Sequence, residues 1–355
     1  MFQDTCRKDG HTFLYEEDVA DNFAFRREKL YQGYVVSNFY ETLEFLVGHK
    51  VLHRDSKNGR LRYHLMVYWQ AEQKIKSGLL KLLKRKVPKN FPKYNLNVSE
   101  LCPEEEFSID FSLECFNRIA TDKQQRLATE KISKSDVVII SGRGGTGKTE
   151  VVTTVLSHIE SILEKKDSEC EEDDIFKNKK SDTDYHEKSS VEDNFDGDSS
   201  KEESSKKSQS NGRILYVAPT GKAASVMRKR AKKAAYTIHQ VLFSYRRWLL
   251  QKSGENKTEA GTVIGEWKFA QTRICAVDEC SMVSVVLFSS LIECLQKASC
   301  LTKIVLLGDV LQLPSIDPGN FMEDLFNAFR PEGLALELET NHRSEGSLIF
   351  ENARR

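Results

Sequence analysis

The chain has 355 residues, 39% of them hydrophobic, and its 53 basic side chains balance its 53 acidic ones. This length is ample for a large core and predicts two or three domains, which excludes a chain disordered throughout. The sequence has no run of 18 apolar residues and opens on a polar, charged segment, so neither a membrane span nor a secretory signal is predicted. We therefore expect an intracellular protein with no membrane partner.

One segment upsets the balance of charge. Residues 164 to 207 contain 16 acidic and 9 basic side chains, together with three Ser pairs and few apolar residues. A segment of this kind buries too little apolar surface to offset its chain entropy. The sequence therefore predicts a disordered acidic insertion over residues 164–212, and a mildly basic remainder.

The first 115 residues predict a mostly helical domain. Apolar side chains recur at helical spacing from Val19 to Val51, and the aromatic-rich run from Leu61 to Trp69 fits either a helix or a strand. A basic segment containing prolines, Lys81 to Lys93, then breaks the pattern. It predicts a solvated connector, with a phosphate contact or a nuclear import signal as the alternatives.

From residue 116 onward the sequence predicts an α/β domain. Four strongly apolar runs each lead into a loop and then a probable helix: Val137–Ile140, Ile214–Val217, Ile274–Val277 and Lys303–Leu307. Strands that alternate with helices imply right-handed crossovers and a doubly wound parallel sheet, whose ligands bind at the carboxyl ends of the strands. We assign residues 116–163 and 213–355 to this domain, with the acidic insertion between them.

A phosphate-binding loop follows the first of these runs. The segment from Gly142 to Thr149 fits the pattern G-x-x-x-x-G-K-S/T, directly after a strand and before a helix. In such a loop the backbone N–H groups surround the phosphates, the lysine reaches the β/γ oxygens and the hydroxyl ligates Mg²⁺. We therefore expect Mg²⁺ and ATP as cofactors. The residues predicted to bind them are Gly142, Gly144, Gly145, Thr146, Gly147, Lys148 and Thr149.

Two further strand ends carry polar side chains suited to the same site. Asp278 and Glu279 end the third run; Asp278 is predicted to hold Mg²⁺ and Glu279 to deprotonate the attacking water, although such a pair alone is often a solvated turn. Gln312 follows the fourth run, and its amide is predicted to contact the γ-phosphate or the water. An ordinary surface glutamine is the alternative for Gln312.

Six motifs, in this order, resemble those of the superfamily 1B helicases, the RecD-like group. They are Gly142–Thr149, Ala218–Ala224, Thr237–His239, Asp278–Met282, Gly308–Pro314 and Thr340–Arg343. The resemblance implies a RecA-like P-loop fold and an ATP-dependent DNA helicase that moves 5′ to 3′ along single-stranded DNA. It also implies work in DNA replication or repair in the nucleus, with shuttling to the cytoplasm as a further expectation.

The resemblance also implies roles for residues outside the phosphate loop. Gln125 is similar to the upstream glutamine that reads adenine, with Gln124 or an exposed helical glutamine as the alternatives. Arg343 is similar to the arginine that neutralises charge at the γ-phosphate, with a surface or salt-bridged arginine as the alternative. Thr220, Lys222 and His239 are expected to contact DNA, although each alone would be structural more often than not.

The acidic insertion has apolar side chains set among carboxylates, at Ile175, Phe176 and Phe195. A plain solvated tether is one interpretation. The other is a segment that folds into a basic groove of a partner, and the resemblance suggests replication protein A as that partner.

The sequence departs from the family in one large respect. It ends at Arg355, soon after the Arg343 motif, whereas the family has a second RecA-like domain that closes the ATP cleft. We therefore expect a fragment or short isoform of a helicase, and the alternative function is a non-catalytic chain that binds ATP, single-stranded DNA or a partner. A third possibility is a P-loop NTPase of another kind, such as an AAA+ or signalling enzyme.

Overall fold

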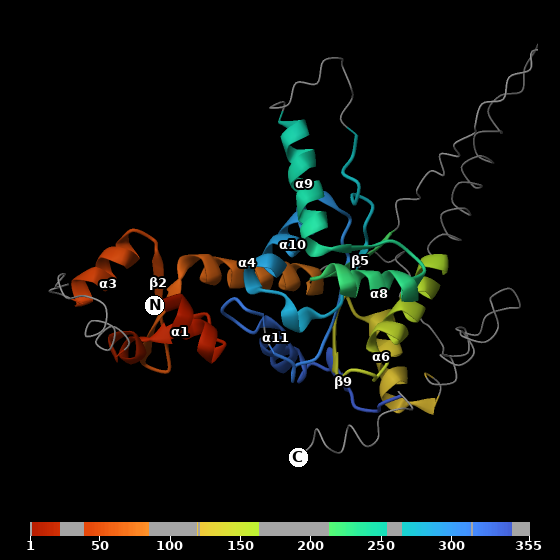
Figure 1. The fold of residues 1–355 in the computed structure, drawn as a ribbon, viewed down its shortest axis with the longest axis horizontal. Helices are drawn as coiled ribbons and strands as arrows, with labels where there is room; N and C mark the ends of the chain where they lie inside the picture. The colour runs from red at the N-terminus through yellow and green to blue at the C-terminus, as the bar shows by residue number, and fades with distance from the viewer. Residues whose placement is uncertain are drawn as a thin grey trace, which may run out of the picture.

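The computed structural model describes residues 2–21, 39–84, 119, 121–162, 213–253, 265–313 and 315–342. Its centre is a six-stranded sheet in the order β6-β5-β7-β8-β4-β9, in which every neighbouring pair is parallel. The strands are β4 (Val137–Gly142), β5 (Ile214–Ala218), β6 (Ala235–Thr237), β7 (Ile274–Val277), β8 (Lys303–Gly308) and β9 (Ala335–Leu338). The predicted doubly wound α/β fold is confirmed (Figure 1).

The four apolar runs of the sequence form the four central strands, and the sequence did not reveal the two edge strands. Each central strand is buried at every position. The edge strands β6 and β9 are three and four residues long and contain half-buried side chains. Their pattern of apolar and polar residues is therefore too short and too mixed to predict a strand.

Alternate side chains of each central strand enter two separate cores, one on each face of the sheet. In β4, Val137 and Ile139 belong to one core, and Val138 and Ile140 belong to the other. A strand directs successive side chains to opposite faces, and helices cover both faces, so both sets are apolar. This is why the strands read as unbroken apolar runs.

The helices divide between the two faces in the same way. Buried residues of α6 (Lys123–Lys134), of the helix over residues 148–162 and of α8 (Gly221–Ala231) fill one core. The other core is filled from α4 (Met66–Leu83), α9 (Ile238–Lys252), α10 (Val285–Ala298) and α11 (Phe321–Phe329). None of the helices in the described ranges is both long and apolar enough to cross a membrane.

The N-terminal part of the chain contains a small sheet as well as helices. Its elements are α1 (Phe2–Asp9), β1 (Phe13–Tyr15), α3 (Phe39–Gly48), β2 (Leu52–Lys57) and β3 (Arg60–Leu65). The three strands form an antiparallel sheet in the order β1-β3-β2. The run from Leu61 to Trp69, ambiguous in sequence, is divided between β3 and the start of α4. Of the predicted connector Lys81–Lys93, the first three residues lie in α4, Lys84 is its C-cap and the rest lies outside the described residues.

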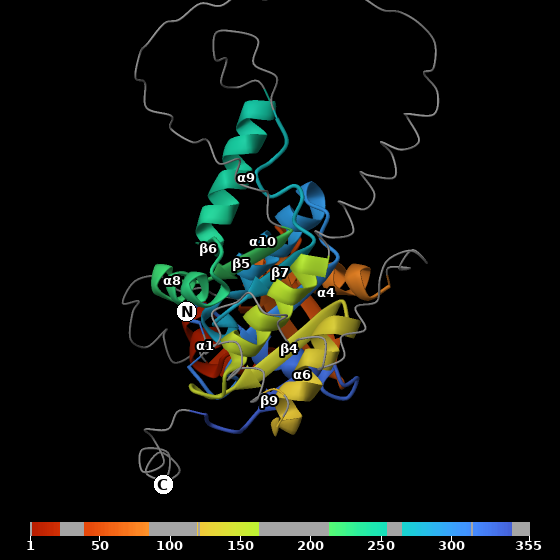
Figure 2. The ribbon, with the colours of Figure 1, turned by 90° about the vertical axis from the view of Figure 1, so that its right-hand side faces the viewer.

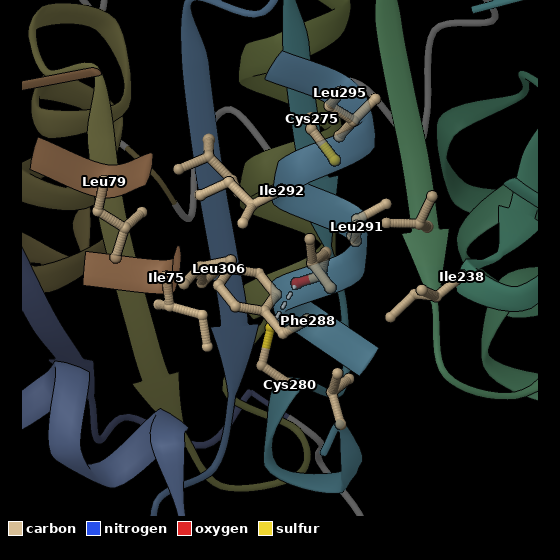
Figure 3. Packing of buried hydrophobic residues seen from close by; sticks show 14 of the residues in the cluster. Ile75, Leu79, Ile238, Cys275, Cys280, Phe288, Leu291, Ile292, Leu295 and Leu306 are labelled. Atoms are coloured by element: carbon tan, nitrogen blue, oxygen red, sulfur yellow. Dashed lines mark hydrogen bonds between the residues drawn. The ribbon is translucent and has the colours of Figure 1, made fainter. Parts of the chain in front are cut away.

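Helix α4 joins this N-terminal part to the sheet domain. Its buried residues belong to the same core as α10, and Figure 3 shows Ile75 and Leu79 facing Phe288 and Ile292. The two helices approach closely at Gly78, whose carbonyl accepts a hydrogen bond from Gln296 Nε2 at 2.7 Å. One turn away, Lys74 Nζ lies 2.7 Å from Glu293 Oε2. Helix α4 therefore completes the core that supports the sheet.

The close approach at Gly78 predicts a defined loss of stability. A Cβ atom at this position would lie 2.8 Å from Ile292 Cδ1, at the mobile end of a side chain. Gly78→Leu should reduce the free energy of unfolding by about 1–3 kcal/mol, because overpacking forces neighbouring side chains from their rotamers. Gly78→Ala should stay within about 1 kcal/mol of the parent, since Ala also favours the helix. Urea unfolding measures both, and equal stability of Gly78→Leu and the parent would contradict this packing.

Candidate nucleotide-binding site

The segment between β4 and the helix over residues 148–162 forms a tight loop that needs glycine. Gly145 and Gly147 have φ values of 95° and 81°, a conformation that other residues rarely adopt. A Cβ atom at Gly142 would lie 2.6 Å from the carbonyl oxygen of Leu338 and 2.9 Å from Thr146 Oγ1. The loop is therefore packed against β9 as well as wound at the helix N-terminus, where backbone N–H groups can receive an anion.

The Lys148 side chain is folded over this loop. Its Nζ donates hydrogen bonds to the carbonyl oxygens of Gly142 and Arg143, the latter at 3.0 Å. Burial lowers the pKa of Lys148, while the carboxylates of Asp309, Asp278 and Glu279 act in the opposite direction. The ammonium therefore lies among acceptors at the carboxyl end of the sheet.

A hydrogen bond connects the loop to the neighbouring half of the site. Thr149 Oγ1 donates to Asp278 Oδ2 at 2.9 Å, although the two residues are 129 positions apart. Asp278 follows β7 directly, and its other oxygen accepts from the Glu279 backbone N–H at 2.9 Å. A hydroxyl beside a carboxylate offers the hard oxygen donors that Mg²⁺ prefers, and Mg²⁺ commonly takes few protein ligands when a phosphate supplies the others. These side chains fit the predicted cofactor.

Burial sets the electrostatics of the acidic pair. Burial raises the pKa of Asp278 above its usual value, and the hydrogen bonds from Glu279 and Thr149 only partly oppose this. Burial and the neighbouring Asp278 carboxylate raise the pKa of Glu279. Glu279 also has a φ of 52°, an uncommon conformation for a residue other than glycine, as the chain turns from β7 into the short 3₁₀ helix η2 (Cys280–Met282).

The end of β8 forms the third wall of the site. Its loop is fixed by two hydrogen bonds, from Val310 N to Ser141 Oγ at 3.2 Å and from Leu311 N to Asp309 Oδ1 at 3.0 Å. Asp309 is buried, and the sequence did not identify it. Gln312 is exposed in this loop and lines the site, as its predicted role requires.

These walls enclose a cavity of about 680 Å³, large enough for a nucleoside triphosphate. Thr220 and Lys222, predicted to contact DNA, also line it, whereas His239 is exposed at the start of α9 and is not among the lining residues. Arg230 is a lining residue that the sequence did not identify. It lies eight positions beyond Lys222, which places both on one face of α8.

The two glutamines considered for adenine contact hold the loop and β9 in place. Gln125 is 2% exposed, and its Nε2 donates to the Thr146 carbonyl at 3.2 Å. Gln124 Oε1 accepts from the Glu339 backbone N–H at 2.8 Å, just beyond β9. Gln125 is therefore not the exposed helical glutamine that the alternative interpretation describes. Adenine contact remains a prediction.

His342 connects the last described segment to both the loop and α6. Its backbone N–H donates to Gly145 at 3.0 Å, and its Nε2 lies 2.9 Å from Asp122 Oδ2. Asp122 caps α6 by accepting from the backbone N–H groups of Gln124 and Gln125. Burial alone would raise the pKa of Asp122, but the hydrogen bonds from His342 and from α6 lower it below its usual value. His342 lines the cavity, and the sequence did not identify it.

Four predicted residues lie outside the described residues. They are Arg343 and the three apolar residues of the acidic insertion, Ile175, Phe176 and Phe195.

Comparison with known proteins agrees with this geometry. Residues 120–353 match the AAA domain family, which is two thirds of the chain. The chain belongs to this family. DNA helicase B of Mus musculus is 37% identical over 245 residues, which are 67% of this chain and 20% of that protein. The RecBCD enzyme subunit RecD of Mycobacterium tuberculosis strain CDC 1551 / Oshkosh is 24% identical over 78% of this chain and 38% of the subunit.

Among solved structures, that of Pif1 helicase from Candida albicans is similar at 14% identity, with a TM-score of 0.37, covering 65% of this chain and 42% of that one. The six ordered motifs, the family match and the sequence relatives together support a superfamily 1 helicase motor of the RecD-like group. The chain spans about a fifth of the length of DNA helicase B and 38% of that of RecD.

Two glycines of the loop give a matched test of the site. Gly142→Ala should weaken binding of a fluorescent ATP analogue about ten-fold or more, because the new Cβ would displace the Leu338 carbonyl and the β4–β9 pair. Gly144→Ala should bind within about two-fold of the parent, since a Cβ at Gly144 meets nothing within 4 Å. Equal binding by the two variants would contradict the packing of the loop against β9.

Proposed function

We propose that this chain binds and hydrolyses Mg²⁺–ATP and couples hydrolysis to 5′-to-3′ movement along single-stranded DNA, as part of a nuclear helicase in DNA replication or repair. The observation that carries the proposal is the Thr149–Asp278 contact at 2.9 Å inside a cavity of about 680 Å³. The names of the relatives, DNA helicase B and RecD, support the substrate class.

In the proposed site the side chains have distinct tasks. Thr149 and Asp278 would hold Mg²⁺, which neutralises phosphate charge when bound. Lys148 Nζ would give up its hydrogen bonds to the carbonyl oxygens of the loop and donate to phosphate oxygens instead. Glu279 would accept a proton from the attacking water, a task that its raised pKa suits because a base works best with a pKa near the operating pH. Gln312 would contact that water or the γ-phosphate.

Further contacts are proposed from the sequence motifs. Arg343 would neutralise charge at the γ-phosphate, and Gln125, or Gln124, would read the adenine. Thr220, Lys222 and His239 would contact single-stranded DNA. Ile175, Phe176 and Phe195 would bind replication protein A.

A second candidate function is binding of ATP and DNA without turnover. It is favoured by the fraction of the relatives that the chain covers, 20% of DNA helicase B and 38% of RecD.

Steady-state ATP hydrolysis, with and without single-stranded DNA, separates the two candidates. For the parent chain we expect DNA-stimulated turnover that falls at low pH, because Glu279 must lose its proton to act as a base. Its raised pKa shifts this fall in kcat to a higher pH than an ordinary glutamate would give. Glu279→Gln should lower kcat roughly 10²–10⁴-fold with little change in KM. The remaining activity should no longer decrease at low pH.

Lys148→Ala is the control, because it should abolish nucleotide binding itself. If the parent binds Mg²⁺–ATP through Lys148 without turnover in the presence of DNA, the non-catalytic function is correct. Turnover by Glu279→Gln equal to that of the parent would refute the proposed base.

A further inference from the structure

Helix α9 presents two different faces. Ile238 and Val241 are buried in the core beneath the sheet, and Leu242, Tyr245 and Trp248 pack against that core. The indole Nε1 of Trp248 donates to the Gly265 carbonyl at 3.1 Å, and the Tyr245 ring contacts Trp267 edge-on at 5.2 Å between centroids. These side chains recur at helical spacing, so they form one anchored stripe along the helix.

The opposite stripe carries a different set of side chains. His239, Phe243, Arg246, Arg247 and Leu250 recur at intervals of three and four residues, and all five are exposed. Phe243 is 70% exposed. Figure 2 shows α9 standing away from the rest of the structure, in agreement with the exposure of these five side chains.

The charge of α9 is of one sign. The helix contains Arg246, Arg247 and Lys252 and has no Asp or Glu among its 15 residues. An exposed aromatic ring flanked by guanidinium groups matches the two features of a single-stranded nucleic acid, whose bases stack on rings while its phosphates attract cations. An acidic protein surface would use the cations but would gain little from the ring.

The position of α9 extends the proposed DNA contacts. The helix begins directly after β6, which pairs in parallel with β5, so the ends of both strands lie at the same edge of the sheet. Thr220 follows β5, and His239 lies in the first turn of α9. With 15 residues, the helix extends this edge by about 22 Å.

We propose that the outer stripe of α9 binds single-stranded DNA, with Phe243 stacked on a base and with Arg246 and Arg247 on neighbouring phosphates. The proposal rests on the proposed function, because it takes DNA as the substrate, and it adds Phe243, Arg246 and Arg247, which lie outside the six motifs.

The test is fluorescence anisotropy of labelled oligothymidylate with the full chain at several salt concentrations. Phe243→Ala should weaken binding about ten-fold. The double variant Arg246→Ala/Arg247→Ala should weaken it and lower the slope of log affinity against log salt by about 1.4, because each phosphate contact contributes roughly 0.7.

Two matched controls come from other helices. Phe45→Ala removes a ring that is 60% exposed on α3, and Lys76→Ala/Lys134→Ala removes two exposed cations, one from α4 and one from α6. Both should leave DNA affinity within about two-fold of the parent, because neither removes a residue for which the sequence suggested a phosphate contact. An abasic oligonucleotide of the same length tests stacking, since the parent should prefer the oligothymidylate and Phe243→Ala should lose that preference.

The outcomes distinguish this inference from the function on which it rests. If the parent binds DNA and the α9 variants bind it equally well, the outer stripe is not a DNA surface and the proposed function stands. If Phe243→Ala weakens binding to the abasic strand as much as to oligothymidylate, stacking is refuted. If the parent binds Mg²⁺–ATP but no DNA, the proposed function fails. Unchanged affinity for the ATP analogue shows that each variant is folded.

Discussion

The hydrogen bond from Thr149 to Asp278 is the contact on which the rest of the site depends. It joins the first turn of the helix after the phosphate-binding loop to the end of β7. The two elements are held at this separation because β8 lies between β4 and β7 and pairs with both in parallel. Three strand ends therefore meet around one cavity, and the hydroxyl, the acidic pair and Gln312 face it from different elements. A polar cluster assembled in this way needs a rigid sheet, which is supported by a core of buried apolar side chains on each face.

The N-terminal part of the chain contributes to that rigidity. Residues of α4 share a core with α10, and α10 follows the acidic pair by way of η2. At Gly78 the two helices are also joined by the hydrogen bond from Gln296 Nε2 to the Gly78 carbonyl. Packed side chains therefore connect α4 to the helix that follows the acidic pair. On the other side of the loop, Asp122 and His342 connect α6 and the segment after β9 to the same glycine-rich turn.

Much of the fold and the centre of the site could be predicted from the sequence, because both depend on local patterns. The runs at Val137, Ile214, Ile274 and Lys303 are buried on both faces and read as strands without knowledge of their neighbours. The glycine spacing from Gly142 to Gly147 reflects backbone conformations that the loop itself requires. Arg230 and His342 were missed because their positions in the cavity depend on how α8 and the segment after β9 pack, and Asp309 was missed because its burial depends on how the loop after β8 folds. The burial of Gln125 beneath the loop also could not be predicted from the sequence, because a polar residue on an amphipathic helix is normally exposed.

The central claim is that Thr149 and Asp278 together hold a magnesium ion on a bound nucleotide. Isothermal titration calorimetry with a non-hydrolysable ATP analogue, with Mg²⁺ and with a chelator, tests it most directly. Thr149→Val removes the hydroxyl and Asp278→Asn removes the negative charge of the carboxylate, while each preserves the shape of the side chain. We predict that Mg²⁺ strengthens binding by the parent chain and that this gain disappears in both variants. The account would be contradicted if Mg²⁺ strengthened binding of the analogue equally in the parent and in both variants, or if the parent did not bind the analogue.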